Sequence, residues 1–274
     1  MASENVPVPF AAGGPRDPRD RSLLSWRAAL ARFWVQDLTV KYNRSVLGVA
    51  WSLLNPALML GVISLAFSFA FGRGDAPGYT LHLLSTLLPW MIFSQAVAEG
   101  AASIVAGEPM LRQFPMPKLI FPLRRVLFRT SEGLLSLAAL FAVAQFLDFS
   151  ATPALLVLPL AVLDLFAASL GFAAIGAVVV VYFRDVEHLI AVGTRAWFYL
   201  TPIIVPFQAI PPEYQQWFAM NPMYYVLELF DAPIARGEWP TEEVMQIATA
   251  FSLTTALIGC ALVRAFDRRL IFRL

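Results

Sequence analysis

The stretch KYNRSVLGVAWSLLNPALML, Lys41 to Leu60, sets a polar and basic cluster directly before a long apolar segment. Residues 45–72 carry no charge, and about 20 such residues are enough for a helix to cross the hydrocarbon core of a bilayer. The stretch therefore predicts a membrane-spanning helix that begins shortly after Arg44. Asn55-Pro56 predicts a bend within this helix, because proline removes one backbone hydrogen bond.

The composition of the whole chain is typical of a multi-span membrane protein. Of its 274 residues, 58% are hydrophobic and 14% are charged, whereas soluble proteins carry roughly 25% charged residues. The apolar residues come in blocks of spanning length. We expect an all-α polytopic membrane protein with six transmembrane helices, at Gly48–Phe71, Tyr79–Ala98, Val126–Leu147, Pro153–Val181, Leu189–Val205 and Val244–Val263.

The distribution of Lys and Arg orients these spans. Of the 20 Lys and Arg residues, all except Arg73 and Arg236 fall on one side of the predicted topology. Loops rich in Lys and Arg lie in the cytoplasm, and an even number of spans puts both termini on the same side. The pattern therefore predicts that both termini are cytoplasmic, with Lys41 and Arg44 anchoring the first span at the anionic inner leaflet.

The chain divides into three regions. Residues 1–21 are rich in Pro, Gly, Arg and Asp without an apolar run, which predicts a disordered cytoplasmic tail and not a cleaved signal peptide. Residues 22–41 carry apolar side chains at helical spacing and predict an amphipathic helix in the membrane interface. A helix packed against a partner is the alternative. Residues 42–274 form the predicted six-span transmembrane domain.

Two connections differ from ordinary loops. The cytoplasmic connection between spans two and three contains Pro109, Pro115, Pro117 and Pro122, and a stiff segment of this kind suits the transmission of force. The external connection between spans five and six is rich in aromatic residues, prolines and acids. It predicts re-entrant or surface-lying helices, which are tolerated at membrane depth only where protein or a water-filled cavity covers them. Its aromatic rings suit stacking on sugars along an exit path and equally suit an aromatic belt at the membrane interface.

The motifs in the sequence exclude several kinds of site. Neither a Walker A pattern nor an HExxH motif occurs, so the chain is not predicted to hold ATP or a zincin metal by itself. Cys260 is the single cysteine and excludes an intramolecular disulfide. His82 and His188 fall on opposite sides of the membrane, too far apart for one metal. We therefore predict no catalytic residue, no metal site and no cofactor in this chain.

Ionisable residues inside the spans are few. Asp164 lies near the middle of the fourth span, where a charge is costly and a functional role is common. A protonated carboxyl, or one paired with Ser or Thr of a neighbouring span, explains it equally well. Glu99 and Glu132 lie nearer span ends, where a structural role is favoured. An ion-coupled carrier using Asp164 and a membrane glycan enzyme are therefore alternative function classes, although a carrier is expected to show several midplane groups and an internal repeat.

Several stretches resemble one family, the permease subunit of ABC-2-type polysaccharide exporters. The segment Lys41–Pro56 is similar to the family's Arg/Lys-Tyr-x-x-Ser-x-Leu-Gly-x-x-Trp-x-x-x-x-Pro motif at the start of the first span. The proline-rich loop, YFRDVEHLI (Tyr182–Ile190), YLTPIIVP (Tyr199–Pro206) and NPMYYVLELFDAPIARG (Asn221–Gly237) extend the resemblance over nearly the whole chain. The last segment looks most like exporters of lipid-linked O-antigen in Gram-negative bacteria. One departure is Asp231, where relatives commonly carry Arg before the Ala-Pro, so that a charge at the external face is reversed.

The resemblance implies a transport subunit that is not itself an enzyme. Two copies of the chain form the conduit, and two copies of a separate cytoplasmic ABC ATPase, which binds MgATP, supply the energy. The assembly moves lipid-linked polysaccharide of the O-antigen type across the bacterial inner membrane, in which the chain is multi-pass, and no nucleic acid takes part. The alternative on the same scaffold is export of teichoic acid, capsule polysaccharide or a small lipophilic compound.

Three groups of residues are expected to carry the function, two of them by the same resemblance and the aromatic group because aromatic rings stack on sugars. The substrate-binding and access group lies at the cytoplasmic membrane boundary and consists of Lys41, Tyr42, Asn43 and Arg44. It suits a pyrophosphate-linked headgroup, because Arg makes bidentate phosphate contacts and Lys acts as a point charge; plain anchoring is the alternative. The conduit or exit aromatics are Trp197, Tyr199, Tyr214, Trp217, Tyr224 and Tyr225. The ATPase-coupling residues are Glu108, Met110, Leu111, Arg112, Gln113 and Phe114 in the loop at about Gly107–Leu119, with Arg184 and Asp185 as a second contact.

Overall fold

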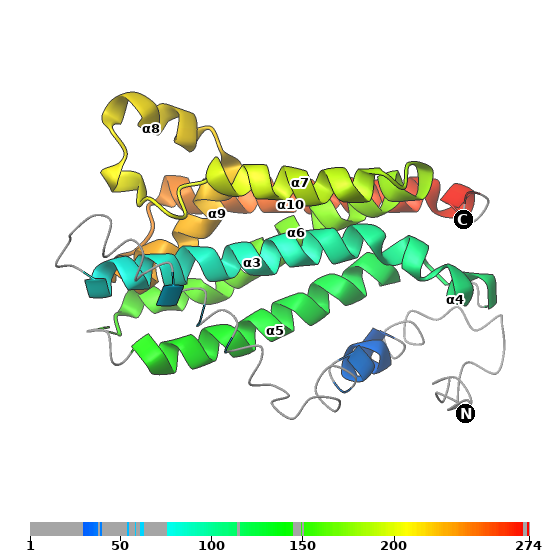
Figure 1. The fold of residues 1–274 in the computed structure, drawn as a ribbon, viewed down its shortest axis with the longest axis horizontal. Helices are drawn as coiled ribbons and strands as arrows, with labels where there is room; N and C mark the ends of the chain where they lie inside the picture. Colours follow the sequence, from blue (N-terminus) through cyan, green and yellow to red (C-terminus); the bar gives the residue numbers. More distant parts are fainter. Residues whose placement is uncertain are drawn as a thin grey trace.

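A computed structural model describes residues 30–37, 39, 54, 58, 61–62, 76–113, 116–144, 149, 151–270 and 273. Within these residues every regular element is a helix, in agreement with the predicted all-α class. The elements labelled in Figure 1 or named below are α3 (Ala76–Ala106), α4 (Glu108–Gln113), α5 (Ile120–Ala144), η1 (Pro153–Val157), α6 (Leu158–Tyr182), α7 (Val186–Tyr199), η2 (Phe207–Ala209), α8 (Pro212–Ala219), α9 (Pro222–Asp231), η3 (Ala232–Arg236) and α10 (Glu242–Leu270).

Three helices among the described residues are long and apolar enough to cross a membrane. They occupy Gly78–Gln113, Pro153–Tyr182 and Glu242–Leu270, and they correspond to the predicted second, fourth and sixth spans. α5 covers the predicted third span from Val126 to Ala144, begins earlier, at Ile120, and carries several charges in its first half. The predicted first span, Gly48–Phe71, lies outside the described residues apart from four helical positions.

The helix at the predicted fifth span is shorter than expected. α7 has 14 residues, and at 1.5 Å per residue it is about 21 Å long, less than the roughly 30 Å of a hydrocarbon core. It ends at Tyr199, three residues before Pro202, and the chain then turns. The turn is held against α3, because Tyr79 donates to the carbonyl of Ile204 at 3.0 Å. The predicted span over Leu189–Val205 is therefore not helical beyond Tyr199.

The long helices α3, α5, α6 and α10 run side by side along the longest axis of the molecule (Figure 1). α6 is central and packs against both α3 and α10. Its buried residues lie on all sides, as expected of a helix that is apolar all round. The crossing of α6 and α10 is close, because a Cβ on Gly171 would lie 2.3 Å from the backbone of Thr255. Small residues let helices approach in this way inside membranes.

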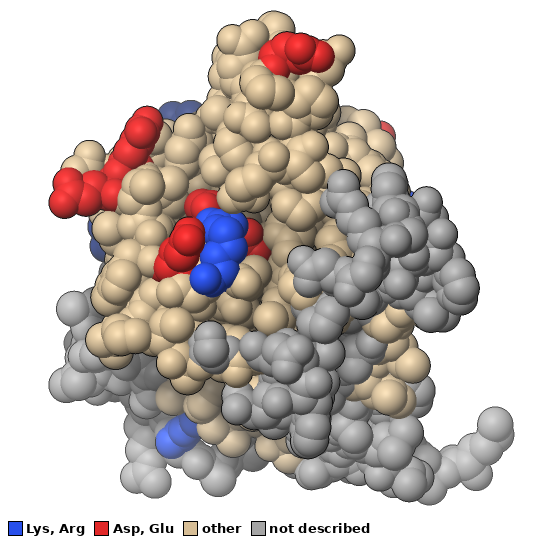
Figure 2. Space-filling view, turned by 90° about the vertical axis from the view of Figure 1, so that its left-hand side faces the viewer, with Lys and Arg blue, Asp and Glu red and all other residues tan. Residues whose placement is uncertain are grey.

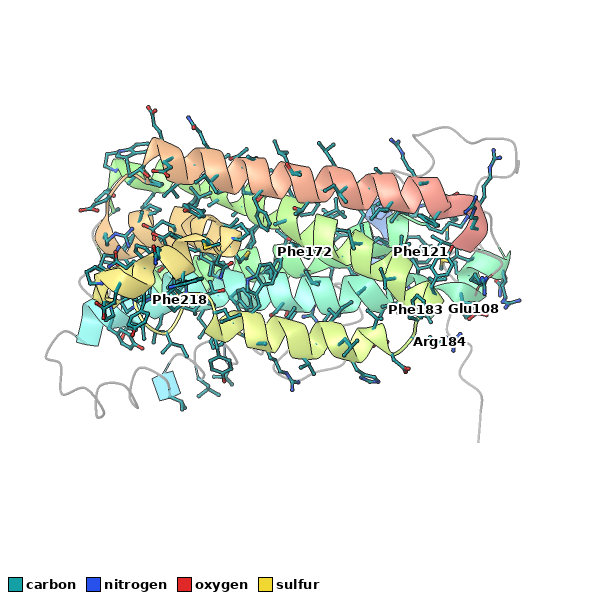
Figure 3. The ribbon with its side chains drawn as sticks, turned by 90° about the horizontal axis from the view of Figure 1, so that it is seen from above. Glu108, Phe121, Phe172, Phe183, Arg184 and Phe218 are labelled. Atoms are coloured by element: carbon teal, nitrogen blue, oxygen red, sulfur yellow. The ribbon has the colours of Figure 1, made fainter. Side chains whose placement is uncertain are left out.

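The interior consists of two main apolar clusters at opposite ends of the bundle. One joins α3, α6 and α9 around residues such as Phe93, Leu165 and Phe230. The other joins α4, the start of α5 and the last turns of α6 and α10. In Figure 3, Phe121 of the second cluster lies toward the end with Glu108, and Phe172, which packs against the first cluster, lies nearer the end with Phe218. Each end of the bundle therefore has its own packed core.

The helical residues 30–37 pack onto α5. Phe33 is buried, and the indole nitrogen of Trp34 donates to the hydroxyl of Ser131 at 3.0 Å. Asp37 accepts two hydrogen bonds of 2.5 Å from Arg124. The sequence pattern left an interface helix and a packed helix open, and these contacts attach the described part of the segment to the bundle.

The connection between α7 and α10 is folded into four short helices. α8 has no buried residue and stands off the bundle (Figure 1). α9 has an apolar face of Met223, Val226, Leu227, Leu229 and Phe230 that is buried against α3, α6 and α10. One helix of this connection thus lies at the surface, while the next is part of the core.

Candidate functional site

A buried ion network surrounds Asp231 at the end of α9, and we name its members, His82, Ser85, Glu228, Asp231 and Arg236, the α9 network. One carboxylate oxygen of Asp231 lies 2.8 Å from Nδ1 of His82 and accepts from Ser85 Oγ at 2.5 Å. The other oxygen accepts from Nη1 of Arg236 at 2.6 Å. Nη2 of Arg236 donates to Glu228. Asp231 is only 4% exposed, so its charge is compensated inside the protein.

Local helix geometry brings these groups together. His82 and Ser85 are three residues apart on α3 and therefore share one face of the helix. The π-helical turn η3 returns Arg236 toward Asp231, and it ends at Gly237, whose φ of 68° is the left-handed conformation that glycine adopts most readily. Figure 2, which views this end of the molecule, shows a basic side chain between acidic ones.

The pKa values of the two acids in the α9 network are shifted in opposite directions. Burial by itself raises the pKa of Asp231, but the hydrogen bonds from His82 and Ser85 and the charges of His82 and Arg236 outweigh it, so this pKa lies below its ordinary value. Burial raises the pKa of Glu228 to about 7, although Arg236 opposes the shift. The two carboxyl groups therefore titrate in different pH ranges.

The position of Asp231 corrects one sequence-based expectation. The resemblance placed a reversed charge at the external face, whereas the carboxylate is buried and paired within the chain. The partners on α3 were not predicted, because His82 was considered only as a metal ligand. The i, i+3 spacing of His82 and Ser85, which places both side chains on one face of α3, was the signal available in the sequence. Nε2 of His82 has no hydrogen-bond partner among the described residues.

Asn221 connects α7 to α9. Its side-chain oxygen accepts from the indole of Trp197 at 2.9 Å and from the backbone N–H of Met223 at 3.1 Å, which caps α9. Its amide donates to the carbonyl of Leu200 at 3.1 Å and to the hydroxyl of Thr201 at 2.8 Å. One side chain therefore fixes the turn after α7, the start of α9 and the orientation of an aromatic ring.

The six predicted conduit aromatics lie in three different environments. Trp197 points into the bundle, where its ring lies 5.3 Å from Phe172 and 5.6 Å from Phe93. Tyr224 stacks on Phe207 at 4.5 Å, with Tyr225 beside it. Three rings are exposed, Tyr199 by 73%, Trp217 by 65% and Tyr214 by 55%. The described residues do not bring all six rings into one surface, and their role in a conduit stays a prediction.

The described residues that were predicted to contact the ATPase lie at one end of the bundle. Glu108 on α4 and Arg184 in the turn before α7 both lie at the end opposite α8 and α9 (Figure 3). Arg112 pairs with Glu108 at 2.8 Å and is exposed, as is Gln113, while Leu111 is buried and Met110 half-buried. Arg184 and Asp185 are exposed as well. Phe114 lies outside the described residues.

The predicted substrate-binding and access group, Lys41, Tyr42, Asn43 and Arg44, lies outside the described residues, so its prediction stays untested. The same holds for Asn55-Pro56 in the first span and for the tail at 1–21.

The three acids that the sequence analysis singled out inside the spans, Asp164, Glu99 and Glu132, have partners in the protein. Asp164 is buried and accepts a hydrogen bond of 2.8 Å from Thr249 on α10, which is the pairing with a neighbouring span that the sequence left open. Glu99 and Glu132 both bond Arg129 on α5. Within the described ranges, no group of three or more His, Cys, Asp or Glu side chains is placed to hold a metal ion.

Comparison with known proteins decides the family. The model of the ABC-2 type transporter family matches residues 28–234, a range that begins just before the described N-terminal helix and ends within η3. The chain belongs to the ABC-2 type transporter family. The resemblance noted in the first span, the proline-rich loop and the α9 segment is thereby confirmed, and the three long apolar helices belong to a membrane transporter.

The alignments of this ABC-2 family member with individual relatives include most of its own length and most of the length of each relative. The chain is 27% identical over 235 residues to the O-antigen export system permease protein RfbA of Myxococcus xanthus, covering 85% of this chain and 90% of the relative. It is 29% identical over 242 residues to the RfbA protein of Klebsiella pneumoniae, with the same two shares. It is 21% identical to the polysialic acid transport protein KpsM of Escherichia coli, covering 89% of this chain and 96% of the relative.

Proposed function

We propose that this chain is the membrane permease subunit of an ATP-driven exporter that moves a lipid-linked polysaccharide of the O-antigen type outward across the bacterial inner membrane. The observation that carries the proposal is the similarity to permeases named for O-antigen export over 85% of the chain and 90% of each relative's length. The family match by itself covers residues 28–234, which include α4 and α9, so the similarity does not depend on a single shared helix.

The energy source lies in a separate subunit. The sequence has no Walker A motif, and the family supports an ABC ATPase partner that binds MgATP. The partner would contact the end where Glu108 of α4 and Arg184 lie together (Figure 3). α4 suits such a contact, because Arg112 and Gln113 are exposed while Leu111 holds the helix in the core. Two permease and two ATPase copies would complete the assembly.

The path of the substrate would run from one end of the bundle to the other. Lys41, Tyr42, Asn43 and Arg44 would meet a pyrophosphate-linked headgroup at the cytoplasmic boundary. Exposed aromatic side chains such as Tyr214 and Trp217 on α8 would meet sugar rings as they leave.

Purification of the chain from its native membrane in mild detergent tests the proposal. We expect an ATPase subunit to co-purify at a one-to-one ratio in a particle that holds two copies of each. Deletion of the gene should remove a surface polysaccharide and leave its lipid-linked precursor inside the cell. A particle without a nucleotide-binding subunit, together with an unchanged cell surface, would refute the proposal and direct attention to Asp164 as the coupling group of an ion-driven carrier.

A second candidate cargo is a capsule polysaccharide. The relatives named for polysialic acid transport match 89% of this chain, although at 20–21% identity. The material that accumulates in the deletion strain distinguishes the two cargoes, and it also reveals a teichoic acid or a small lipophilic compound. An O-antigen precursor supports the first candidate, and a capsule polymer supports the second.

A further inference from the structure

The loop that carries α4 is seated in a packed core and does not hang from the bundle. Leu111 of α4 and Met116 just beyond it are both buried. They join the apolar cluster formed by the start of α5 and the last turns of α6 and α10. Gly107, the residue before α4, lies so close to Phe121 that a Cβ there would be 2.2 Å from the ring. A displacement of α4 must therefore move its neighbours, because packed cores transmit strain.

One polar contact ties this loop directly to α10. The backbone N–H of Lys118 donates to Oδ1 of Asp267 at 3.1 Å, and its ammonium group donates to Oδ2 at 3.3 Å. Lys118 is only 7% exposed, and a buried ammonium group needs a partner of this kind. Two bonds from one residue to one carboxylate fix both the distance and the direction between the loop and the last turns of α10.

α10 reaches from this contact to the opposite end of the bundle. Near its middle it crosses α6 closely, where a Cβ on Gly259 would lie 2.5 Å from the carbonyl oxygen of Gly171. In its first turns Ala248 is buried in the same apolar cluster as Phe230 of α9. Most of the apolar window of α10 lies outside the buried core. The helix thus packs along α6, approaches it most closely near its own middle, and contacts α9 as well.

We infer that Lys118 and Asp267 are a positioning pair that passes a displacement of α4 to α10, and through α10 to α9. This inference rests on the proposed function, since the displacement comes from the ATPase partner. The close crossing with α6 acts as the pivot, so movement of the Asp267 end of α10 is accompanied by movement of the Ala248 end. The pair touches neither nucleotide nor substrate. It determines how much of the ATP-driven movement reaches the end with the α9 network.

The test compares transport with ATP hydrolysis in the full assembly. Asp267→Ala removes both bonds, Asp267→Asn keeps an acceptor for the backbone N–H but loses the charge, and Lys118→Met loses only the ammonium bond. We expect ATPase activity of the co-purified complex to stay within about twofold of wild type. Surface polysaccharide in cells that depend on the variant should fall by about fivefold or more for Asp267→Ala, a typical size for coupling between distant sites, and by less for the other two.

Two comparisons separate positioning from a purely structural role. Arg269→Ala, an exposed position on the same turn of α10, is the matched control and should leave both readouts unchanged. The double variant Lys118→Met with Asp267→Ala should export no less than Asp267→Ala alone, because both changes interrupt one connection.

The outcomes are distinct. If the ratio of export to ATP hydrolysis for Asp267→Ala equals that of wild type, the inference is overturned. It is also overturned if complex yield, ATPase activity and export fall equally in both Asp267 variants, because that result indicates a purely structural role. A wild-type chain that co-purifies with no ATPase overturns the proposed function itself.

Discussion

Replacement of Asp231 by Ala is expected to lower the stability of the protein strongly, although the residue lies at the end of the short helix α9, in the connection between the long helices α7 and α10. The carboxylate is 4% exposed and accepts from Ser85 and Arg236, with His82 at 2.8 Å. Its loss removes the side-chain partner of His82 and one of the two acceptors of both Ser85 and Arg236. Removing one partner of a buried ion pair costs about 3–5 kcal/mol, and because Arg236 keeps Glu228 we expect the lower end of that range.

The expected shift in melting temperature follows from this figure. For a chain of this size, 1 kcal/mol corresponds to about 2–4 °C, so about 3 kcal/mol corresponds to about 6–12 °C. The assay is the fraction of detergent-purified protein that stays monodisperse after heating, at one fixed heating time, because membrane proteins of this kind unfold irreversibly. Asp231→Asn, which keeps an acceptor for Ser85 but loses the charge, should lie between wild type and Asp231→Ala.

A matched control uses an exposed acid that lies beside the α9 network. Glu238 lies 3.7 Å from Nε of Arg236, and its side chain is 72% exposed. Exposed ion pairs contribute about 0–1 kcal/mol, so Glu238→Ala should change the midpoint little. The expected contribution of about 3 kcal/mol from the buried α9 network would be refuted by a heating midpoint for Asp231→Ala within about 1 °C of wild type. It would also be refuted if Glu238→Ala lowered the midpoint as much as Asp231→Ala does.

Three other substitutions each test one contact. Gly171→Ala should destabilise the protein by about 1–3 kcal/mol, because its Cβ meets the backbone of α10 at 2.3 Å; Gly193→Ala, with nothing within 4 Å, should not, and equal midpoints would refute the close crossing. Asn221→Ala should cost about 1–3 kcal/mol and shift the emission of Trp197, measured against Trp197→Phe; an unchanged spectrum would contradict the contact. Burial raises the pKa of Glu228 to about 7, so the folded chain holds a proton that the unfolded chain releases near its ordinary value. This contribution to stability is complete below the unfolded pKa and is lost as the pH rises through about 7. Glu228→Gln should flatten the fall in melting temperature over that window, and an unchanged slope would exclude the residue as its source.

Several features of the fold were predictable because they depend on local composition and spacing. The apolar runs that contain Phe93, Ala173 and Leu257 are of spanning length, and the structure places long helices there. The break at Leu200 was missed because an apolar run shows where a chain is buried but not where its backbone turns. Pro202 was the local signal, and it was outweighed by the hydrophobicity around it.

The candidate sites were predictable to different degrees. By resemblance Glu108 was assigned to the main ATPase contact and Arg184 to a second contact, and the structure places both residues at one end of the bundle. Trp197 was assigned to a conduit from its residue type alone, but Asn221 turns it into the core. An aromatic residue suits a sugar path and a hydrophobic core equally well, so composition could not distinguish these environments.

The sequence by itself determined the class of this protein, a helical membrane transporter without a nucleotide motif, because hydrophobic length and missing motifs are properties of the chain alone. Only the tertiary structure decided what Asp231 and Lys118 do. Each of these two charged residues is stabilised by a partner 149 positions away along the chain, His82 and Asp267 respectively. Whether a charge is exposed at a surface or buried in a pair depends on which helices pack beside it, and that depends on the packing of the whole bundle.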